Sequence, residues 1–161
     1  MGEEVAYIRA KTAKAVDWMP KKPKDVLSPR YKARIGYESE YTLVKKLVSK
    51  GWPGWYAVRT PGSGSGKMAK PDIIAVENGE LYAIEVKSSR KPYVMLNREQ
   101  VRRLLEFCRM FRLRCPHCGR EIAAKPVVAV RFMGHGWEFV QVPEEADRPI
   151  IVKRKAKGIS S

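Results

Sequence analysis

Two acidic residues and a lysine flank a turn signal in this sequence, in an arrangement that suits metal binding. Asn78-Gly79 separates two apolar segments, and this dipeptide favours a two-residue type I′ turn because both turn positions need a positive φ. Such a turn pairs Glu77 with Glu80. Counting outward from that pair predicts that Asp72 lies directly across from Glu85. The hairpin is therefore expected to bring two carboxylates face to face.

Facing carboxylates indicate a divalent cation, because like charges at opposed strand positions destabilise a sheet unless something offsets their repulsion. Glu85 and Lys87 are two positions apart and so share one face of the strand. Together with Asp72 they form a hard oxygen site that suits Mg²⁺, with Mn²⁺ as a substitute, beside an ammonium group. Such a site suits phosphodiester hydrolysis, because the metal ion lowers the pKa of bound water and the lysine orients or deprotonates the nucleophile. The alternative is an exposed hairpin whose carboxylates pair with surface lysines, since short motifs of this kind often match by chance.

The composition points to a polyanionic partner. The chain has 161 residues, enough for one domain, and its 32 Lys and Arg against 17 Asp and Glu give a net charge of +15. Basic residues that neutralise phosphates release counterions, which favours a nucleic acid over the alternatives of solubility or an acidic lipid surface. No apolar run approaches the ~20 residues that span a bilayer, and the first residues lack the apolar region of a signal peptide. We expect a soluble cytoplasmic protein that works at the nucleoid, with no membrane partner.

Apolar periodicity and turn residues predict the helices and strands that would position these groups. We expect a helix from Tyr37 to Gly51, and a second helix that Asn97 caps with Gln100 as its capping-box partner. The expected strands cover residues 55–60, 72–77, 80–87, 126–133 and 137–142, with a loop rich in Gly and Ser over 61–71. We expect a central domain over 34–145. A basic arm over 1–33, with a weak helix at 5–16, precedes it, and a flexible basic tail over 146–161 follows it.

The sequence around these residues resembles a known group of nucleases. Pro71-Asp72 together with Glu85-Val86-Lys87 is similar to the motif of the PD-(D/E)xK nuclease superfamily. Gly36 and Glu40 at a helix start, a strand that ends on Arg59 and the Ser/Gly loop that follows complete a pattern that resembles the archaeal Holliday junction resolvases. The resemblance covers residues 32–142. It implies an α/β, restriction-endonuclease-like fold with a central mixed sheet of about five strands flanked by helices, and it makes 34–145 the nuclease domain.

The resemblance also implies roles for individual residues. The catalytic residues would be Glu40, Asp72, Glu85, Lys87 and Ser63. The metal ligands would be Glu40, Asp72, Glu85 and the main-chain carbonyl of Val86. Lys87 would be the catalytic lysine, and Ser63 would touch DNA near the cleaved bond. Without the resemblance, Glu40 is more simply a solvated carboxylate at a helix start, and Glu38 competes with it for the acidic role.

The implied activity is paired, symmetric cleavage of four-way DNA junctions by a homodimer, whose two-fold axis matches the pseudo-symmetry of that substrate. No small-molecule cofactor is implied. The residues expected to bind DNA are Arg34, Arg59, Ser63, Lys67 and Lys70. Each of these is otherwise an ordinary surface residue. Two alternatives stay open: a restriction- or repair-type nuclease that acts on duplex or flapped DNA, and a catalytically inactive basic DNA-binding module.

The segment 112–125 departs from the pattern of the family by inserting a C-x-x-C pair. Cys115 and Cys118 resemble half of a zinc site, which would need Cys108, His117 or a second subunit to complete it. A disulfide between the two cysteines and a pair of free thiols are the alternatives. Near this segment lie aromatic residues that would serve the core, the dimer interface or both: Phe107, Phe111, Phe132, Trp137 and Phe139.

Overall fold

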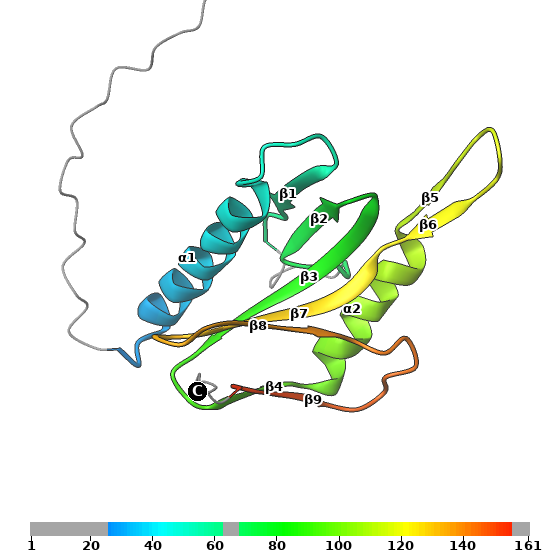
Figure 1. Cartoon of the computed structure of the whole chain (residues 1–161). Helices are drawn as coiled ribbons and strands as arrows, with labels where there is room; N and C mark the ends of the chain where they lie inside the picture. Colours follow the sequence, from blue (N-terminus) through cyan, green and yellow to red (C-terminus); the bar gives the residue numbers. More distant parts are fainter. Residues whose placement is uncertain (1–25, 63–67, 156–161) are drawn as a thin grey trace, which may run out of the picture.

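A mixed five-stranded sheet lies at the centre of the chain in the computed structural model, which describes residues 26–62 and 68–155 (Figure 1). Its strands are β1 (Trp55–Arg59), β2 (Ile73–Glu77), β3 (Glu80–Ser89), β7 (Lys125–Phe132) and β8 (Gly136–Gln141), in the spatial order β1-β2-β3-β7-β8. Strands β3 and β7 run parallel, and the other three neighbouring pairs run antiparallel. The predicted α/β fold with a mixed sheet is therefore confirmed. The weak helix expected over 5–16, and also Ser63 and Lys67, lie outside the described residues.

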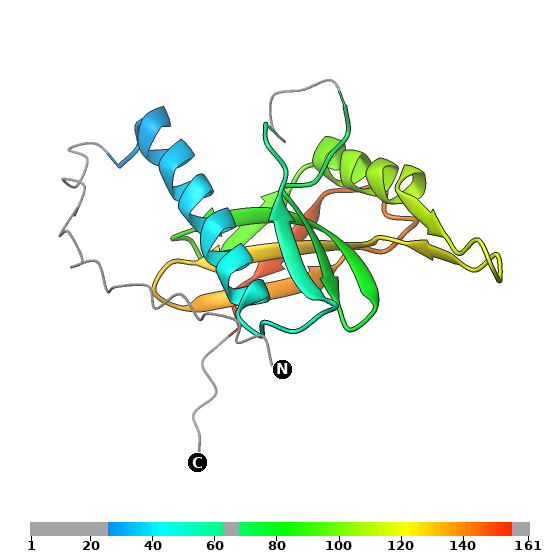
Figure 2. The same ribbon diagram turned by 90° about the horizontal axis from the view of Figure 1, so that it is seen from above.

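Helix α1 (Pro29–Val48) covers one face of this sheet (Figures 1 and 2). Ser28 caps the helix by accepting a hydrogen bond from the backbone N–H of Tyr31, and Pro29 occupies the first turn, where its missing N–H is not needed. Leu43 is fully buried in the core on this face, which also contains Ile73 of β2. The helix begins at Pro29 rather than Tyr37, so the expected basic arm is helical in its last residues.

Helix α2 (Arg98–Met110) covers the opposite face, together with a small sheet of β4 (Tyr93–Leu96) and β9 (Ile150–Lys153). The predicted capping box is confirmed: Asn97 Oδ1 accepts from the N–H of Gln100 at 2.8 Å, and Gln100 Oε1 accepts from the N–H of Asn97 at 3.2 Å. Strand β9 corrects the expectation of a flexible tail over 146–161, because residues 150–153 pair with β4. The larger core lies on this face and includes Val101, Leu104, Leu105, Cys108, Val128, Val130 and Phe132.

The C-x-x-C segment forms a hairpin of its own. Strands β5 (Arg112–Arg114) and β6 (Glu121–Ala123) pair only with each other in the described structure and project beyond the central sheet (Figures 1 and 2). Of the aromatic residues expected to serve a core or an interface, Phe132 is buried, whereas Phe111 and Phe139 are 37% and 46% exposed. No helix within the described ranges combines the length and the apolar character needed to cross a membrane.

Candidate active site

The hairpin of β2 and β3 holds the acidic pair at the centre of the candidate site. Asn78 and Gly79 both have positive φ, and Glu77 pairs with Glu80, as predicted. The register continues to Ile73 opposite Ile84, and there the ladder ends.

Asp72 does not continue the ladder but sits in a bend just before β2. Its backbone N–H donates to the carbonyl of Ile84 at 3.1 Å, one residue short of the predicted partner Glu85. Its side chain turns toward β3, where the Oδ2 atom accepts a hydrogen bond of 2.8 Å from the backbone N–H of Val86. The expectation that Asp72 lies directly across from Glu85 is therefore wrong in register, but the carboxylate of Asp72 still reaches the strand segment that carries Glu85.

Glu85 and Lys87 share a face of β3, as their spacing predicts, and form an ion pair. Lys87 Nζ donates to Glu85 Oε1 at 2.7 Å, and the two side chains are 26% and 16% exposed. Burial raises the pKa of Glu85 above its ordinary value and the negative charge of Asp72 raises it further, while the ammonium of Lys87 lowers it. The site thus holds two mutually repelling carboxylates that a cation would stabilise.

Glu40 lies on α1 and pairs with Arg59 at the end of β1. The guanidinium of Arg59 also lies over the ring of Tyr37, 4.4 Å from its centroid. Arg59 is the Cα partner of Ile73, the residue after Asp72, so Glu40 is tied to the strand end next to the acidic pair. Within the described ranges, however, no three acidic, His or Cys side chains gather closely enough to hold a metal ion, so Glu40 does not join Asp72 and Glu85 there.

The other residues expected at the site are placed as follows. Arg34 forms an ion pair of 2.7 Å with Glu38, the competing acidic residue, which leaves Glu40 as the one directed at the sheet. Lys70 Nζ donates to the carbonyl of Pro61 at 2.9 Å, so it bridges the two ends of the loop. Val86, whose carbonyl was an expected metal ligand, lies between Glu85 and Lys87 and pairs with Ala129 of β7.

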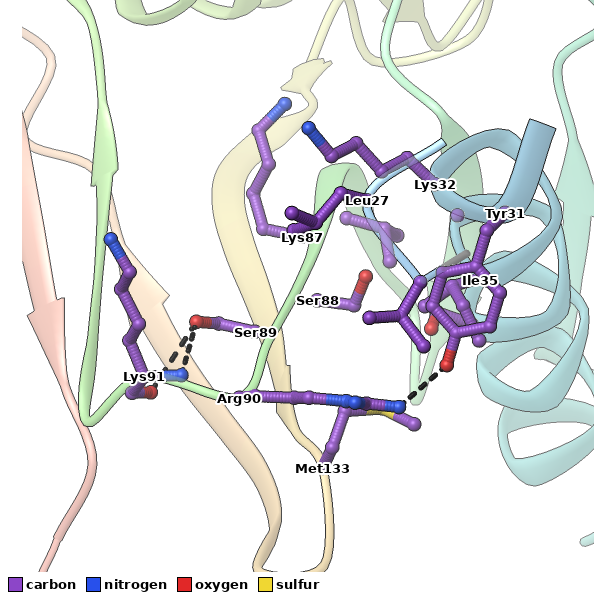
Figure 3. Close-up of a pocket in the computed structure, with 14 residues that line it drawn as sticks. Leu27, Tyr31, Lys32, Ile35, Lys87, Ser88, Ser89, Arg90, Lys91 and Met133 are labelled. Atoms are coloured by element: carbon purple, nitrogen blue, oxygen red, sulfur yellow. Dashed lines mark hydrogen bonds between the residues drawn. The ribbon is translucent and has the colours of Figure 1, made fainter. Parts of the chain in front are cut away.

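A cavity of about 570 Å³ lies between the N-terminal half of α1 and the end of β3, with Lys87 on its wall (Figure 3). Lys32 extends toward the cavity from α1 and Lys87 from β3 (Figure 3), and the guanidinium of Arg90 donates to the hydroxyl of Tyr31 at 2.6 Å. Lys32, Arg90 and Lys91 line this cavity although they are not among the residues expected from the sequence. The position of Arg90 and Lys91 just beyond the Glu-x-Lys motif is the sequence signal that could have identified them.

Arg103 of α2 is a second unexpected neighbour of the acidic pair. Its guanidinium donates to the carbonyl of Met68 at 2.9 Å, and its positive charge lowers the pKa of Glu85. In the sequence Arg103 is simply the residue before Leu104, which belongs to the buried face of α2. Nothing in the neighbouring residues indicates that Arg103 contributes to a site on the hairpin.

Comparison with known proteins gives a consistent result. A sequence model described as archaeal Holliday junction resolvase (hjc) matches residues 31–160. The crossover junction endodeoxyribonuclease Hje of Saccharolobus solfataricus is 36% identical over 118 residues, which cover 73% of this chain and 78% of that protein. A crossover junction endodeoxyribonuclease of Sulfolobus islandicus rod-shaped virus 1 is 47% identical over 77 residues, or 48% of this chain, and the match spans only 64% of the viral protein.

A solved structure supports the same relationship. Archaeoglobus fulgidus Hjc, a Holliday junction resolvase from an archaeal hyperthermophile, superposes with a TM-score of 0.55 and 26% sequence identity, over 71% of this chain and 83% of that one. The residues 31–160 that match the family model contain the central sheet, the acidic hairpin, α2 and all but the first two residues of α1. This chain belongs to the archaeal Holliday junction resolvase family.

Proposed function

We propose that this chain is a metal-dependent endonuclease that resolves four-way DNA junctions by paired, symmetric cuts. The observation that supports it best is the grouping of Asp72, Glu85 and Lys87 on one hairpin, with 2.7 Å between Lys87 Nζ and Glu85 Oε1. The region that matches the resolvase family model, residues 31–160, contains this group, and the chain is similar to relatives that are named crossover junction endodeoxyribonucleases. The proposed setting is inside the cell, at the nucleoid, where such a substrate arises.

The donor set of the site fits Mg²⁺, with Mn²⁺ as a substitute. Asp72 and Glu85 supply hard carboxylate oxygens, and Mg²⁺ is usually held by one or two carboxylates, several waters and phosphate oxygens of the substrate. The main-chain carbonyl of Val86 is the proposed third ligand, and the side chain of Glu40 is the proposed fourth once it turns from Arg59 toward the ion. When bound, the ion lowers the pKa of a water ligand and stabilises charge on the phosphate that is attacked.

Lys87 is the proposed catalytic lysine. Glu85 holds its ammonium group in a half-buried position, so the side chain loses little further freedom when the substrate arrives. From there Nζ donates a hydrogen bond to the attacking water or to an oxygen of the scissile phosphate. Ser63, four residues after the end of β1 in the sequence, is the proposed contact with DNA next to the cleaved bond.

The cavity beside Lys87 gives the proposed path of the DNA backbone. Lys32, Arg90 and Lys91 place positive charge around it, and neither Lys32 nor Lys91 pairs with a described carboxylate. Ser39 is fully buried on the cavity wall, and its hydroxyl has no hydrogen-bond partner among the described residues. Lysine and arginine at such a surface bind phosphates without reading base sequence, which suits an enzyme that recognises the shape of a junction.

Two copies of the chain are proposed to act as a homodimer, because one active site per strand is needed for a symmetric pair of cuts. The test is nicking of a synthetic four-way junction in Mg²⁺, in Mn²⁺ and in EDTA. A linear duplex with the sequence of one junction arm is the substrate control, and Asp72→Asn is the protein control. We expect two symmetric cuts that vanish in EDTA, and an Asp72→Asn protein that binds the junction without cutting it.

Two results would contradict the proposal. Equal cutting of duplex and junction would remove the claim of structure specificity and favour a duplex-cutting nuclease. Unchanged cutting by Asp72→Asn would remove the assigned site.

A further inference from the structure

We propose that the tip of the β5–β6 hairpin is half of a structural zinc site, which a second copy of this chain completes with the same two cysteines. The site would be a tetrahedral centre of four thiolates, with Cys115 and Cys118 contributed by each copy. This inference goes beyond the cleavage reaction, and it shares with the proposed function only the pairing of two copies.

Backbone hydrogen bonds hold the tip in a turn that presents both sulfurs. The N–H of Cys115 donates to the carbonyl of Arg120, and the N–H of Gly119 donates to the carbonyl of Cys115, each at 2.9 Å. The N–H groups of His117 and Cys118 donate to the sulfur of Cys115. Gly119 has a φ of +71°, which a side chain would strain, so glycine is needed to close this turn. Both thiols are free, and Cys118 is exposed, so the tip is accessible to a metal ion.

The hairpin is too small to be stable by strand pairing alone. Each of its strands has three residues, and the two form a separate sheet. An isolated two-stranded hairpin is marginally stable in water even when its strands are longer than these. A metal ion at the tip would supply the missing stability, because binding to preformed ligands adds directly to folding free energy.

One chain does not supply enough ligands. Structural zinc takes four ligands in a tetrahedral arrangement, and the described residues contain no cluster of three or more His, Cys, Asp or Glu that could hold a metal. Cys108 is only 7% exposed and packs in the core on α2, so it is not available to complete the site. A two-fold axis through the metal doubles the pair of cysteines to the four that zinc requires.

An exposed apolar surface at the base of the hairpin fits the second copy. Met110, Phe111 and Leu113 lie at the end of α2 and the start of β5, and their exposed fractions are 81%, 37% and 53%. Neighbouring apolar side chains that stay in water are typical of an interaction surface. This surface and the cysteine tip belong to one hairpin, so a second copy that packs along the hairpin can cover the surface and supply the second pair of cysteines.

The net positive charge of the hairpin also favours an anionic centre between the two copies. Residues 112–121 contain three arginines and one glutamate. Arg112 pairs with Glu121 at 3.4 Å, which leaves Arg114 and Arg120 as net positive charge close to the cysteines. Two such tips repel each other. A zinc ion bound by four thiolates carries a net negative charge and would offset that repulsion.

The test is a cobalt titration of the full chain, without DNA and in reducing buffer after removal of metals with EDTA. An Asp72→Asn background removes metal binding at the active site. Tetrahedral Co²⁺ bound to thiolates absorbs strongly in the visible range, so the end point gives the number of ions per chain. We expect one ion per two chains, displaced by Zn²⁺. Cys115→Ser and Cys118→Ser should abolish the absorption, and Cys108→Ser, the matched control, should keep it.

Three outcomes would overturn the proposal: an end point of one ion per chain, no thiolate absorption, or full absorption in Cys115→Ser. The cleavage proposal does not depend on this result, because the titration contains no DNA and uses an inactive background. Loss of cleavage in the wild-type chain would likewise leave the zinc proposal intact.

Discussion

The hydrogen bond from the N–H of Val86 to Asp72 makes it possible to test separately whether Asp72 stabilises the fold and whether it is needed for cleavage. Asp72 is 9% exposed and Val86 is 8% exposed, so the bond of 2.8 Å is shielded from water. We predict that Asp72→Ala and Asp72→Asn both lose cleavage, but that only Asp72→Ala loses stability. Asparagine keeps an oxygen that accepts from the N–H of Val86, whereas alanine leaves that buried donor without a partner.

The size of the effect follows from the environment of the bond. A buried N–H that loses its acceptor costs about 1–3 kcal/mol. Both substitutions remove the charge that repels Glu85, so this gain is common to the two variants and cancels in their difference. For a domain of this size, 1 kcal/mol corresponds to roughly 3–5 °C in Tm. The two variants should therefore differ by about 3–15 °C, with Asp72→Asn close to the wild type or above it.

The assay is thermal unfolding of the three proteins in EDTA, followed by circular dichroism, with junction nicking measured in Mg²⁺ on the same protein preparations. Equal Tm values for Asp72→Ala and Asp72→Asn would refute the structural role of the bond. A cleaving Asp72→Asn protein would refute the metal-binding role. The two results are independent, since stability is measured without metal and cleavage is measured with it.

Three further predictions concern other buried or capping groups. Burial and Asp72 raise the pKa of Glu85, so its charged form destabilises the folded state at a pH above 4.5, the ordinary pKa of the group. In chemical denaturation in EDTA, Glu85→Gln should therefore be more stable than the wild type at pH 7, and this advantage should disappear below pH 4.5. Burial raises the pKa of Cys108 from 9.0 to about 11, so the unfolded thiol loses its proton first, and the stability of the wild type relative to Cys108→Ala should fall between pH 9 and 11 in urea unfolding. Asn97→Ala removes the capping box with Gln100 and should cost about 1 kcal/mol in the same measurement, whereas Asn97→Ser should recover most of that loss.

Local signals were sufficient for the parts of the fold that local chemistry determines. Asn78-Gly79 determined the hairpin and its register as far as Ile73, and Asn97 with Gln100 determined the start of α2. The start of α1 also has a local signal, because Ser28-Pro29 is a capping residue followed by a first-turn proline. The expected start at Tyr37 was wrong because it was based on the apolar periodicity alone.

Features that depend on contacts between residues far apart in the sequence could not be predicted from local patterns. Asp72 leaves the ladder where Thr60 binds its carbonyl through the backbone N–H, a contact made by β1 and invisible in the hairpin sequence. Strand β4 has four residues, and its partner Ile150–Lys153 lies more than fifty positions further along the chain. The basic residues around that partner led to the prediction of a flexible tail. Arg103, whose charge acts on Glu85, belongs to α2, on the face of the sheet opposite α1. Each of these positions is set by tertiary packing rather than by the residues next to it.

The pairing of Arg59 with Glu40 connects two roles that the sequence suggested separately. Arg59 was an expected phosphate ligand and Glu40 an expected metal-positioning acid, yet each side chain holds the other. A guanidinium that is already neutralised by a carboxylate adds little to the counterion release that drives DNA binding, so Lys32 and Lys91 at the cavity should dominate that term before catalysis begins. If Glu40 turns toward a bound metal ion, Arg59 is released at the strand end beside Asp72, where a phosphate would replace the lost carboxylate. The two roles are therefore compatible only when metal and DNA are bound together, which would make each one strengthen the binding of the other.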